Sequence, residues 1–189
     1  MSDSKQIRSF IAIPLPDALK SSALAIQDRL KPKLPNVRWT KAESMHLTLH
    51  FFGELSQENL EKAGAVMVSI ESLFSPFKLA VSGVGAFPSN DRARIVWLGV
   101  DSAGLTRLYA ALSKALQMGG FRCETRPFKP HITLGRVRNS PLKARHILSP
   151  ESDTVAGEMT VSGLTLFESE LLPDGAVHRP RQTIQFTAG

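Results

Sequence analysis

The sequence predicts an α+β fold with two pseudo-symmetric lobes, each an antiparallel sheet with helices outside, that flank a central cleft. Short apolar segments bounded by Pro, Gly or Ser alternate with longer segments of helical periodicity, which is typical of this class. The order strand, helix, strand occurs at 8–49 and again at 93–134. Both copies end on the pattern His-apolar-Thr-Leu, at 46–49 and 131–134. We therefore expect the two halves to fold alike.

Residues 1–76 contain three expected strands and two expected helices. Apolar residues three or four positions apart indicate the helices, and Pro, Gly and Ser residues bound the segments. In order, we expect a strand at 8–13, a helix capped by Asp17 and ended by Pro32, a short strand at 37–40, a strand at 46–53, and a helix capped by Ser56 with an apolar stripe that reaches Phe74.

The chain continues beyond residue 76 with two strands around the turn "PSNDR", near the boundary of the halves, and then with a helix and three further strands. Leucines at helical spacing mark the helix, and the glycine pair at its end is a typical helix stop. In order, we expect strands at 77–87 and 93–100, a helix from Ser102 to Gly119, a strand at 131–137, and strands near 159–168 and 177–186.

Length and composition indicate one soluble globular unit. With 189 residues, 42% hydrophobic and 21% charged, the chain suits a single bilobal domain over 1–189, with mixed lobes and halves of roughly 1–90 and 91–189. Disorder and coiled coil do not fit this composition. The net charge of +6 favours a polyanion such as nucleic acid, a phosphorylated ligand or an acidic membrane surface, although it also serves solubility alone.

Cellular location is expected to be cytoplasmic. The single cysteine allows neither an intramolecular disulfide nor a cysteine metal cluster. The apolar run near the N-terminus is too short for a signal peptide and contains Pro14. No run approaches the roughly 20 apolar residues of a membrane span. No membrane contact and no obligate protein partner are expected.

The repeated motif gives the candidate active site. Alternate side chains of a strand share a face, so His46 and Thr48 point one way, and His131 and Thr133 do the same in the second copy. The apolar residues between them anchor each strand. Two alternatives remain: two half-exposed strands without a function, or a metal pair of His46 and His50. The segment is β-like and lacks the HExxH pattern, so no metal is expected.

Two histidines and two threonines suit displacement at phosphorus without a metal or cofactor. One imidazole acts as a general base that activates water, and the other protonates the leaving oxygen. Threonine hydroxyls donate hydrogen bonds to phosphoryl oxygens, where charge grows during the reaction. Arg136 follows the second motif, and its guanidinium suits phosphate geometry. The residues alone leave open which histidine is the acid.

With these motifs, "HLTLHFFG" and "RPFKPHITLGRV", the chain resembles the 2H phosphoesterase superfamily, and most closely the RNA 2′,3′-cyclic phosphodiesterases, also called 2′–5′ RNA ligases. The resemblance covers nearly the whole chain, from "RSFIAIPLP" to "LTLFESELLPDGAVH". It implies a bilobal α+β fold and metal-independent hydrolysis of a terminal 2′,3′-cyclic phosphate on RNA to a 2′-phosphomonoester. Some relatives also join tRNA halves, so the expected partners are RNA ends or tRNA fragments that carry a cyclic phosphate.

The resemblance also implies roles for particular residues. His46 would donate a proton to the leaving 3′ oxygen, and His131 would accept one from water. Thr48 and Thr133 would hold the phosphate, and Arg136 matches a basic position that relatives have after the second motif. Relatives often carry Tyr at the positions of Phe167 and His178, which leaves the base preference open.

Two further substrate contacts are expected from the residues. The aromatic ring of Phe10, like those of Trp39 and Phe87, can stack on a base. His50 lies on the catalytic face if its strand is regular. Two other functions also fit the motifs: a non-catalytic module that binds nucleotides or RNA ends, and a phosphodiesterase for a small cyclic nucleotide.

Overall fold

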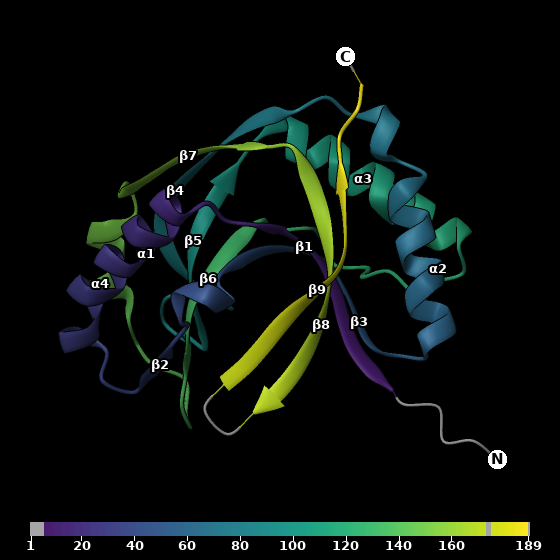
Figure 1. Cartoon of the computed structure of the whole chain (residues 1–189). Helices are drawn as coiled ribbons and strands as arrows, with labels where there is room; N and C mark the ends of the chain where they lie inside the picture. Colours follow the sequence, from purple (N-terminus) through teal and green to yellow (C-terminus); the bar gives the residue numbers. More distant parts are fainter. Residues whose placement is uncertain (1–5, 173–174, 189) are drawn as a thin grey trace.

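The structure, a computed structural model, describes residues 6–172 and 175–188. Its strands form one antiparallel sheet in the order β7-β4-β5-β6-β3-β1-β8-β9, and β2 pairs with β6 (Figure 1). The strands are β1 Ile7–Pro14, β2 Val37–Trp39, β3 His46–Leu55, β4 Phe77–Phe87, β5 Ile95–Asp101, β6 His131–Val137, β7 Val155–Val161, β8 Gly163–Leu172 and β9 Gly175–Gln185.

The sheet divides into two lobes at the contact between β3 and β6, where only Leu47 and Ile132 pair. We call β3, β1, β8 and β9 the first lobe, and β6, β5, β4, β7 and β2 the second lobe. This arrangement confirms the expected α+β class and the two lobes.

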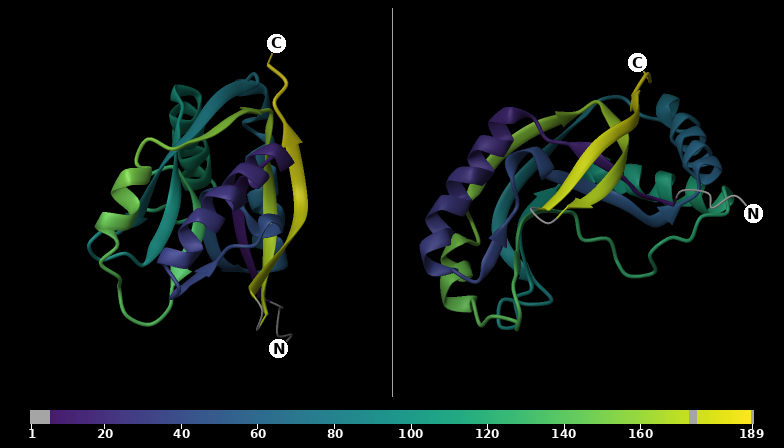
Figure 2. Two further views of the ribbon diagram at one scale, coloured as in Figure 1. Left: turned by 90° about the vertical axis from the view of Figure 1, so that its left-hand side faces the viewer. Right: turned by 60° about the horizontal axis from the view of Figure 1, so that its bottom comes forward.

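The helices lie at the two ends of the sheet. In Figures 1 and 2, α1 and α4 lie beside the second lobe and α2 beside the first, while α3 lies next to α2 and also contacts β4 of the second lobe. Accordingly, α1 contacts β7, and α2 contacts α3 and all four strands of the first lobe. The helices are α1 Asp17–Leu30, α2 Gln57–Val68, α3 Ala103–Met118 and α4 Arg145–Leu148.

The two similar halves of the chain exchange strands, and β4 and β8 occupy equivalent places in this exchange. Each half contains a strand, a helix, a motif strand and a further strand in this order. These are β1, α1, β3 and β4 in the first half, and β5, α3, β6 and β8 in the second. However, β4 pairs with β5 and β7 in the second lobe, and β8 pairs with β1 in the first. Each lobe thus contains strands from the other half of the sequence, β8 and β9 in the first lobe and β2 and β4 in the second.

Helix boundaries follow local capping. Ser56 and Ser102 are the N-caps of α2 and α3, and their hydroxyls accept hydrogen bonds from Asn59 N and Leu105 N, as expected. The expectation for α1 was wrong, because Asp17 is the first helical residue and the N-cap position is Pro16, with no side-chain cap.

Two expected elements differ in extent. The second helix ends at Val68, and a 3-10 turn at Glu71–Leu73 follows instead of more α-helix, although Ile70 remains buried. The strand expected near 159–168 is two strands, β7 and β8, which separate at Ser162 and lie at opposite sides of the sheet. The apolar pattern is nearly continuous through this point, so it does not reveal the break.

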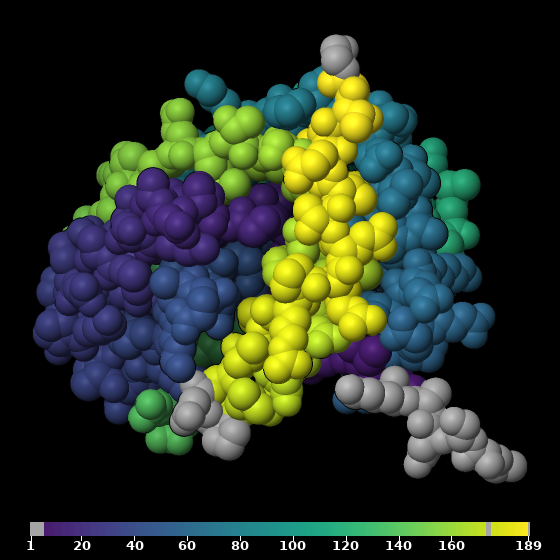
Figure 3. All heavy atoms as spheres, in the orientation of Figure 1, coloured from purple at the N-terminus to yellow at the C-terminus, as the bar shows by residue number. Residues whose placement is uncertain are grey.

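A single hydrophobic core joins the lobes. The residues between the motif polar groups, Leu47 and Ile132, are 0% and 1% exposed, and they belong to one continuous cluster with Ile11, Leu98 and Leu134. In Figure 3, β9 crosses the front of the molecule between α2 on one side and α1 on the other. No helix in the described part of the chain is long and apolar enough to cross a membrane.

Candidate active site

The β3–β6 contact brings the two motifs together. Because Leu47 pairs with Ile132 in antiparallel register, His46 lies beside Thr133 and Thr48 lies beside His131. Leu47 and Ile132 point into the core, so the four polar residues share the opposite side of the sheet. We call this side, defined by His46, Thr48, His131 and Thr133, the histidine face.

Both imidazoles are held through the same ring nitrogen. His46 Nδ1 lies 2.8 Å from the carbonyl oxygen of Ser44, and His131 Nδ1 lies 2.7 Å from that of Lys129. A carbonyl oxygen only accepts, so each Nδ1 carries a proton. In the neutral ring, Nε2 then has its lone pair available to take a proton. Both rings therefore have the same tautomer, with the proton on Nδ1 and with Nε2 free to accept a proton.

The surroundings favour the neutral form of both rings. Burial, as the largest cause, lowers the pKa of His46 to about 4 together with His178, Arg136 and His131, and against the Ser44 hydrogen bond that raises it. Burial also lowers the pKa of His131, and the charge of Arg136 lowers it further, whereas the bond to Lys129 raises it. A phosphate anion between the rings would favour their protonated forms.

A β-bulge follows each motif at the same place. Ile11 and Ala12 pair with His50 and Thr48, so Leu49 is the extra residue in β3. Likewise, Val96 and Trp97 pair with Gly135 and Thr133, so Leu134 is the extra residue in β6. An extra residue shifts the alternation of side chains by one position beyond it. Positions that would face the core in a regular strand therefore turn to the histidine face.

This shift places Arg136 on the histidine face, five residues after His131. In a regular strand an odd separation puts two side chains on opposite sides. With the bulge, Arg136 shares the side of His131, which agrees with its effect on the pKa values of His46 and His131. Its side chain is exposed. The structure thus brings the predicted phosphate-binding residue to both histidines.

The same shift removes His50 from the histidine face. His50 is 6% exposed, its ring packs against Phe52 with the ring centres 4.5 Å apart, and its Nε2 has no hydrogen-bond partner among the described residues. The expectation of a substrate contact required a regular strand, and the bulge at Leu49 breaks this regularity. His46 and His50 also point to opposite sides, so they do not form the metal pair that their spacing allowed. The described residues contain no group of three His, Cys, Asp or Glu side chains placed to hold a metal.

Phe10 lies behind His46. Its ring stacks on His46 with the centres 4.6 Å apart and on Phe167 with the centres 5.2 Å apart. With 3% of its surface exposed, Phe10 offers no face to a base, contrary to the expectation from its aromatic ring. Phe87 plays a comparable part in the second lobe, where its ring meets His131 edge to face at 4.8 Å.

His178 of β9 is a neighbour that sequence spacing did not reveal. Its ring meets those of His46 and Phe10 edge to face, at 5.0 and 4.9 Å between centres. The same strand is tied to the segment before His46 by a hydrogen bond from Ser44 Oγ to the Ala176 carbonyl oxygen, 3.1 Å long. The pairing of β8 and β9 creates this contact, and only its departure from relatives marked His178 in the sequence.

Gln27 of α1 is a second residue that the sequence did not reveal. It is 1% exposed, and its Nε2 donates to the carbonyl oxygens of Thr40 and Leu134, both at 2.8 Å. The Leu134 carbonyl also accepts from Thr40 N. These bonds satisfy the backbone of the bulge residue, which the strand ladder leaves unpaired. Gln27 therefore supports the bulge that aims Arg136.

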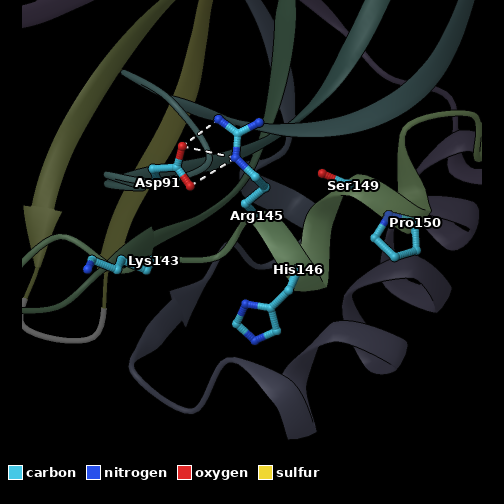
Figure 4. Close-up of a pocket in the computed structure, with 6 residues that line it drawn as sticks. All are labelled: Asp91, Lys143, Arg145, His146, Ser149 and Pro150. Atoms are coloured by element: carbon cyan, nitrogen blue, oxygen red, sulfur yellow. Dashed lines mark hydrogen bonds and ion pairs between the residues drawn. The ribbon is translucent and has the colours of Figure 1, made fainter.

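A hollow in the surface lies away from the histidine face. It has a volume of about 700 Å³ and is lined by Asp91, Lys143, Arg145, His146, Ser149 and Pro150. As Figure 4 shows, the guanidinium of Arg145 is bound to the Asp91 carboxylate, while Lys143 and His146 point away from this pair. None of the predicted site residues lines this hollow.

Comparison with known proteins adds a family match. The family model described as "LigT like Phosphoesterase" matches the chain twice, over residues 13–97 and 98–178. Each match contains one of the two histidine motifs.

Curated relatives extend over most of the chain. A protein of Methanothermobacter thermautotrophicus named RNA 2′,3′-cyclic phosphodiesterase is 32% identical over 179 residues, which cover 92% of this chain and 95% of the relative. A protein of Archaeoglobus fulgidus with the same name is 33% identical over 174 residues, which cover 92% of this chain and 97% of the relative.

Solved structures share the fold. A crystal structure of a Thermus thermophilus protein matches with a TM-score of 0.83 and 26% identity, over 96% of this chain and 99% of that one. The crystal structure of E. coli LigT complexed with 3′-AMP matches with a TM-score of 0.77 and 26% identity, over 97% of this chain and 99% of that one.

Proposed function

Since the chain belongs to the LigT-like phosphoesterase family, we propose that it hydrolyses the terminal 2′,3′-cyclic phosphate of RNA to a 2′-phosphomonoester. The curated relatives that carry this activity in their names support the proposal, because they match over nine-tenths of the chain. The substrates would be RNA ends or tRNA fragments. The net charge of +6 fits such an anionic partner.

The reaction proceeds by displacement at phosphorus without a metal. His131 Nε2 takes a proton from water, whose oxygen attacks phosphorus, and the bond from phosphorus to the 3′ oxygen breaks. His46 Nε2 gives its proton to that leaving oxygen. The hydroxyls of Thr48 and Thr133 and the guanidinium of Arg136 bind the phosphoryl oxygens, where negative charge grows.

One observation carries this proposal: the two motifs meet across the β3–β6 contact with both imidazoles held at Nδ1. A positioned general acid typically raises the rate of the chemical step by about 10²- to 10⁴-fold, and so does a positioned general base. A module that only binds nucleotides needs no second imidazole in this tautomer. Phe10 supports the mechanism indirectly, because its ring fixes the orientation of His46.

The first test measures hydrolysis of an RNA ending in a 2′,3′-cyclic phosphate, with EDTA present. We expect His46→Ala and His131→Ala each to lower kcat by about 10²- to 10⁴-fold, and the product of the wild type to be a 2′-phosphate. His146→Ala is the matched control, since His146 is exposed and remote from the motifs. Unchanged turnover in both motif variants, or loss of activity with EDTA, contradicts the mechanism.

The second test separates the acid from the base. Sulfur in place of the 3′ oxygen gives a leaving group that departs without protonation. This substrate should restore turnover in His46→Ala but not in His131→Ala. The reverse pattern would exchange the two roles.

A substrate panel distinguishes the alternatives. A phosphodiesterase for small cyclic nucleotides would turn over mononucleotides better than RNA, and a binding module would turn over neither. We further propose that residues 1–189 form a single bilobal domain. We also propose that the same groups support 2′–5′ RNA ligation with a 5′ hydroxyl in place of water: its oxygen bonds to phosphorus, His131 takes its proton, the bond to the 3′ oxygen breaks, and His46 protonates that oxygen.

A further inference from the structure

We propose that Phe51 and Arg8 form the binding site for the nucleotide that precedes the one carrying the cyclic phosphate. This inference rests on the proposed RNA substrate and adds a subsite to it. It also explains how two nearly equivalent histidines take different roles.

Phe51 lies on the histidine face. It pairs directly with Phe10 across β1 and β3, and directly paired residues of an antiparallel sheet project to the same side. Phe10 in turn stacks on His46. The Phe51 side chain is 48% exposed, whereas the neighbouring Phe10 is almost fully buried. An exposed aromatic ring on this face is available to a ligand.

Arg8 extends this aromatic surface. It lies two residues before Phe10 on β1, and therefore on the same side, with its guanidinium carbon 4.5 Å from the centre of the Phe51 ring. None of the ion pairs between described residues involves Arg8. An aromatic ring with a neighbouring guanidinium is the combination that binds single-stranded nucleic acid, through stacking on a base and attraction of its phosphate.

Phe51 and Arg136 are equivalent positions of the two lobes. Each lies five residues after its motif histidine and beyond the same bulge, and they pair with Phe10 of β1 and Ile95 of β5. The lobes therefore present the same His and Thr groups but differ here, with an aromatic ring in the first lobe and a cation in the second. A cyclic phosphate at an RNA end is equally asymmetric, because the RNA lies on one side of phosphorus and the attacking water on the other.

This asymmetry orients the substrate. The RNA follows the aromatic side, so the leaving 3′ oxygen faces His46 in the first lobe, and water approaches from His131 and Arg136 in the second. Five residues of a regular strand span about 16 Å, and the bulge at Leu49 shortens this span by only part of one residue. The Phe51 backbone therefore lies farther from that of His46 than the base of the reacting nucleotide extends from its phosphate. The base on Phe51 therefore belongs to the preceding nucleotide.

The experiment compares kcat/KM for a short RNA and for a mononucleoside, both ending in a 2′,3′-cyclic phosphate. In Phe51→Ala we expect the ratio of RNA to mononucleoside to fall by about 10- to 100-fold, mainly through KM for the RNA. Phe51→Trp keeps a stacking surface and should keep the ratio. Leu73→Ala, which removes an exposed apolar side chain outside the histidine face, is the control. An unchanged ratio in Phe51→Ala overturns the inference.

Two further measurements cover the other outcomes. Arg8→Gln should reduce the dependence of log KM for the RNA on log salt concentration by about 0.7, the value for one phosphate contact in a single strand. If no substrate is turned over, the proposed function fails, and anisotropy with a labelled RNA ending in a 2′-phosphate tests the subsite alone. Weaker RNA binding by Phe51→Leu, which retains the apolar bulk, supports the site, and equal binding overturns it.

Discussion

At the scale of single residues, the histidine face holds its two imidazoles uncharged. Phe10 covers one face of the His46 ring and His178 meets it edge on, while Arg136 and His131 add nearby positive charge. All these neighbours raise the free energy of a charged His46. Each Nε2 thus has a free lone pair, and in the proposed mechanism the anionic substrate raises the pKa of His46 so that this ring can act as the acid.

The lowered pKa of His46 predicts a specific loss of stability in acid. An unfolded chain protonates this histidine as the pH falls through about 6.5, whereas the folded chain protonates it only at about 4. Between these values the unfolded form binds more protons, so the free energy of unfolding falls as the pH drops. Urea unfolding at pH 7 and pH 4.5 should show a loss that is about 2 kcal/mol smaller in His46→Asn than in the wild type. Equal losses would contradict the lowered pKa.

The sequence predicted the four motif residues because their arrangement is local. Three residues of a strand suffice to put a His and a Thr on one side, with an apolar anchor on the other. The directions of the side chains after Leu49 and Leu134 depend on the bulges, and no residue pattern in the sequence indicates a bulge at either place. For this reason the sequence did not reveal that His50 turns inward or that Phe51 faces the site. The position of His178 beside His46 depends on pairing between strands that are distant in the sequence, so local patterns did not predict it.

At the scale of elements, the bulge of β6 depends on groups outside the strand. Gln27 and Thr40 supply the hydrogen bonds that the Leu134 carbonyl does not obtain from β5. Gly135 leaves room for β2, because a Cβ there would meet Val37 Cγ1 at 2.5 Å. The helix and the short strand next to β6 therefore fix the direction of Arg136.

Replacing Gln27 should weaken both the fold and the site. Gln27→Leu leaves the Thr40 carbonyl without this donor in the interior, which costs about 1–3 kcal/mol of unfolding free energy in urea. The substitution also loosens the bulge in β6. The Arg136 side chain is then no longer held toward the phosphate, so KM for the RNA should rise. Gln117→Leu, at an exposed position of α3, should change stability by less than about 0.5 kcal/mol. Equal effects of the two substitutions would contradict the supporting role of Gln27.

Most elements followed from periodicity and capping, and the exceptions have physical causes. The leucine stripe of α3 and the serine caps of α2 and α3 are short-range signals that tertiary contacts did not override. The separation of β7 from β8 is a tertiary property, because each strand pairs at a different side of the sheet. Local periodicity indicates where a strand lies in the sequence, but it does not indicate which strands pair with it.

At the scale of the whole molecule, the exchange of β4 and β8 makes each lobe depend on both halves of the chain. Both partners of β4 lie after residue 90, and the second neighbour of β1 is β8. The shared core crosses between the lobes at Leu47 and Ile132. The two halves that the sequence pattern marks are therefore units of repetition and not units of folding.

Separate expression of residues 1–90 and 91–189 should yield fragments that do not fold alone. Each fragment lacks a strand of its own lobe and exposes sheet edges and core side chains. Neither should show a cooperative thermal transition, whereas the complete chain should show a single one by circular dichroism. A cooperative transition in either isolated fragment would contradict this dependence.

The strand exchange also gives approximate symmetry without identical sides. In a symmetric homodimer both sides of a shared site carry the same side chain, because a substitution in one subunit occurs in the other as well. A single chain is free of that constraint, so position 51 is Phe while its counterpart 136 is Arg. Under the proposed subsite, this freedom lets one site distinguish the two ends of its substrate.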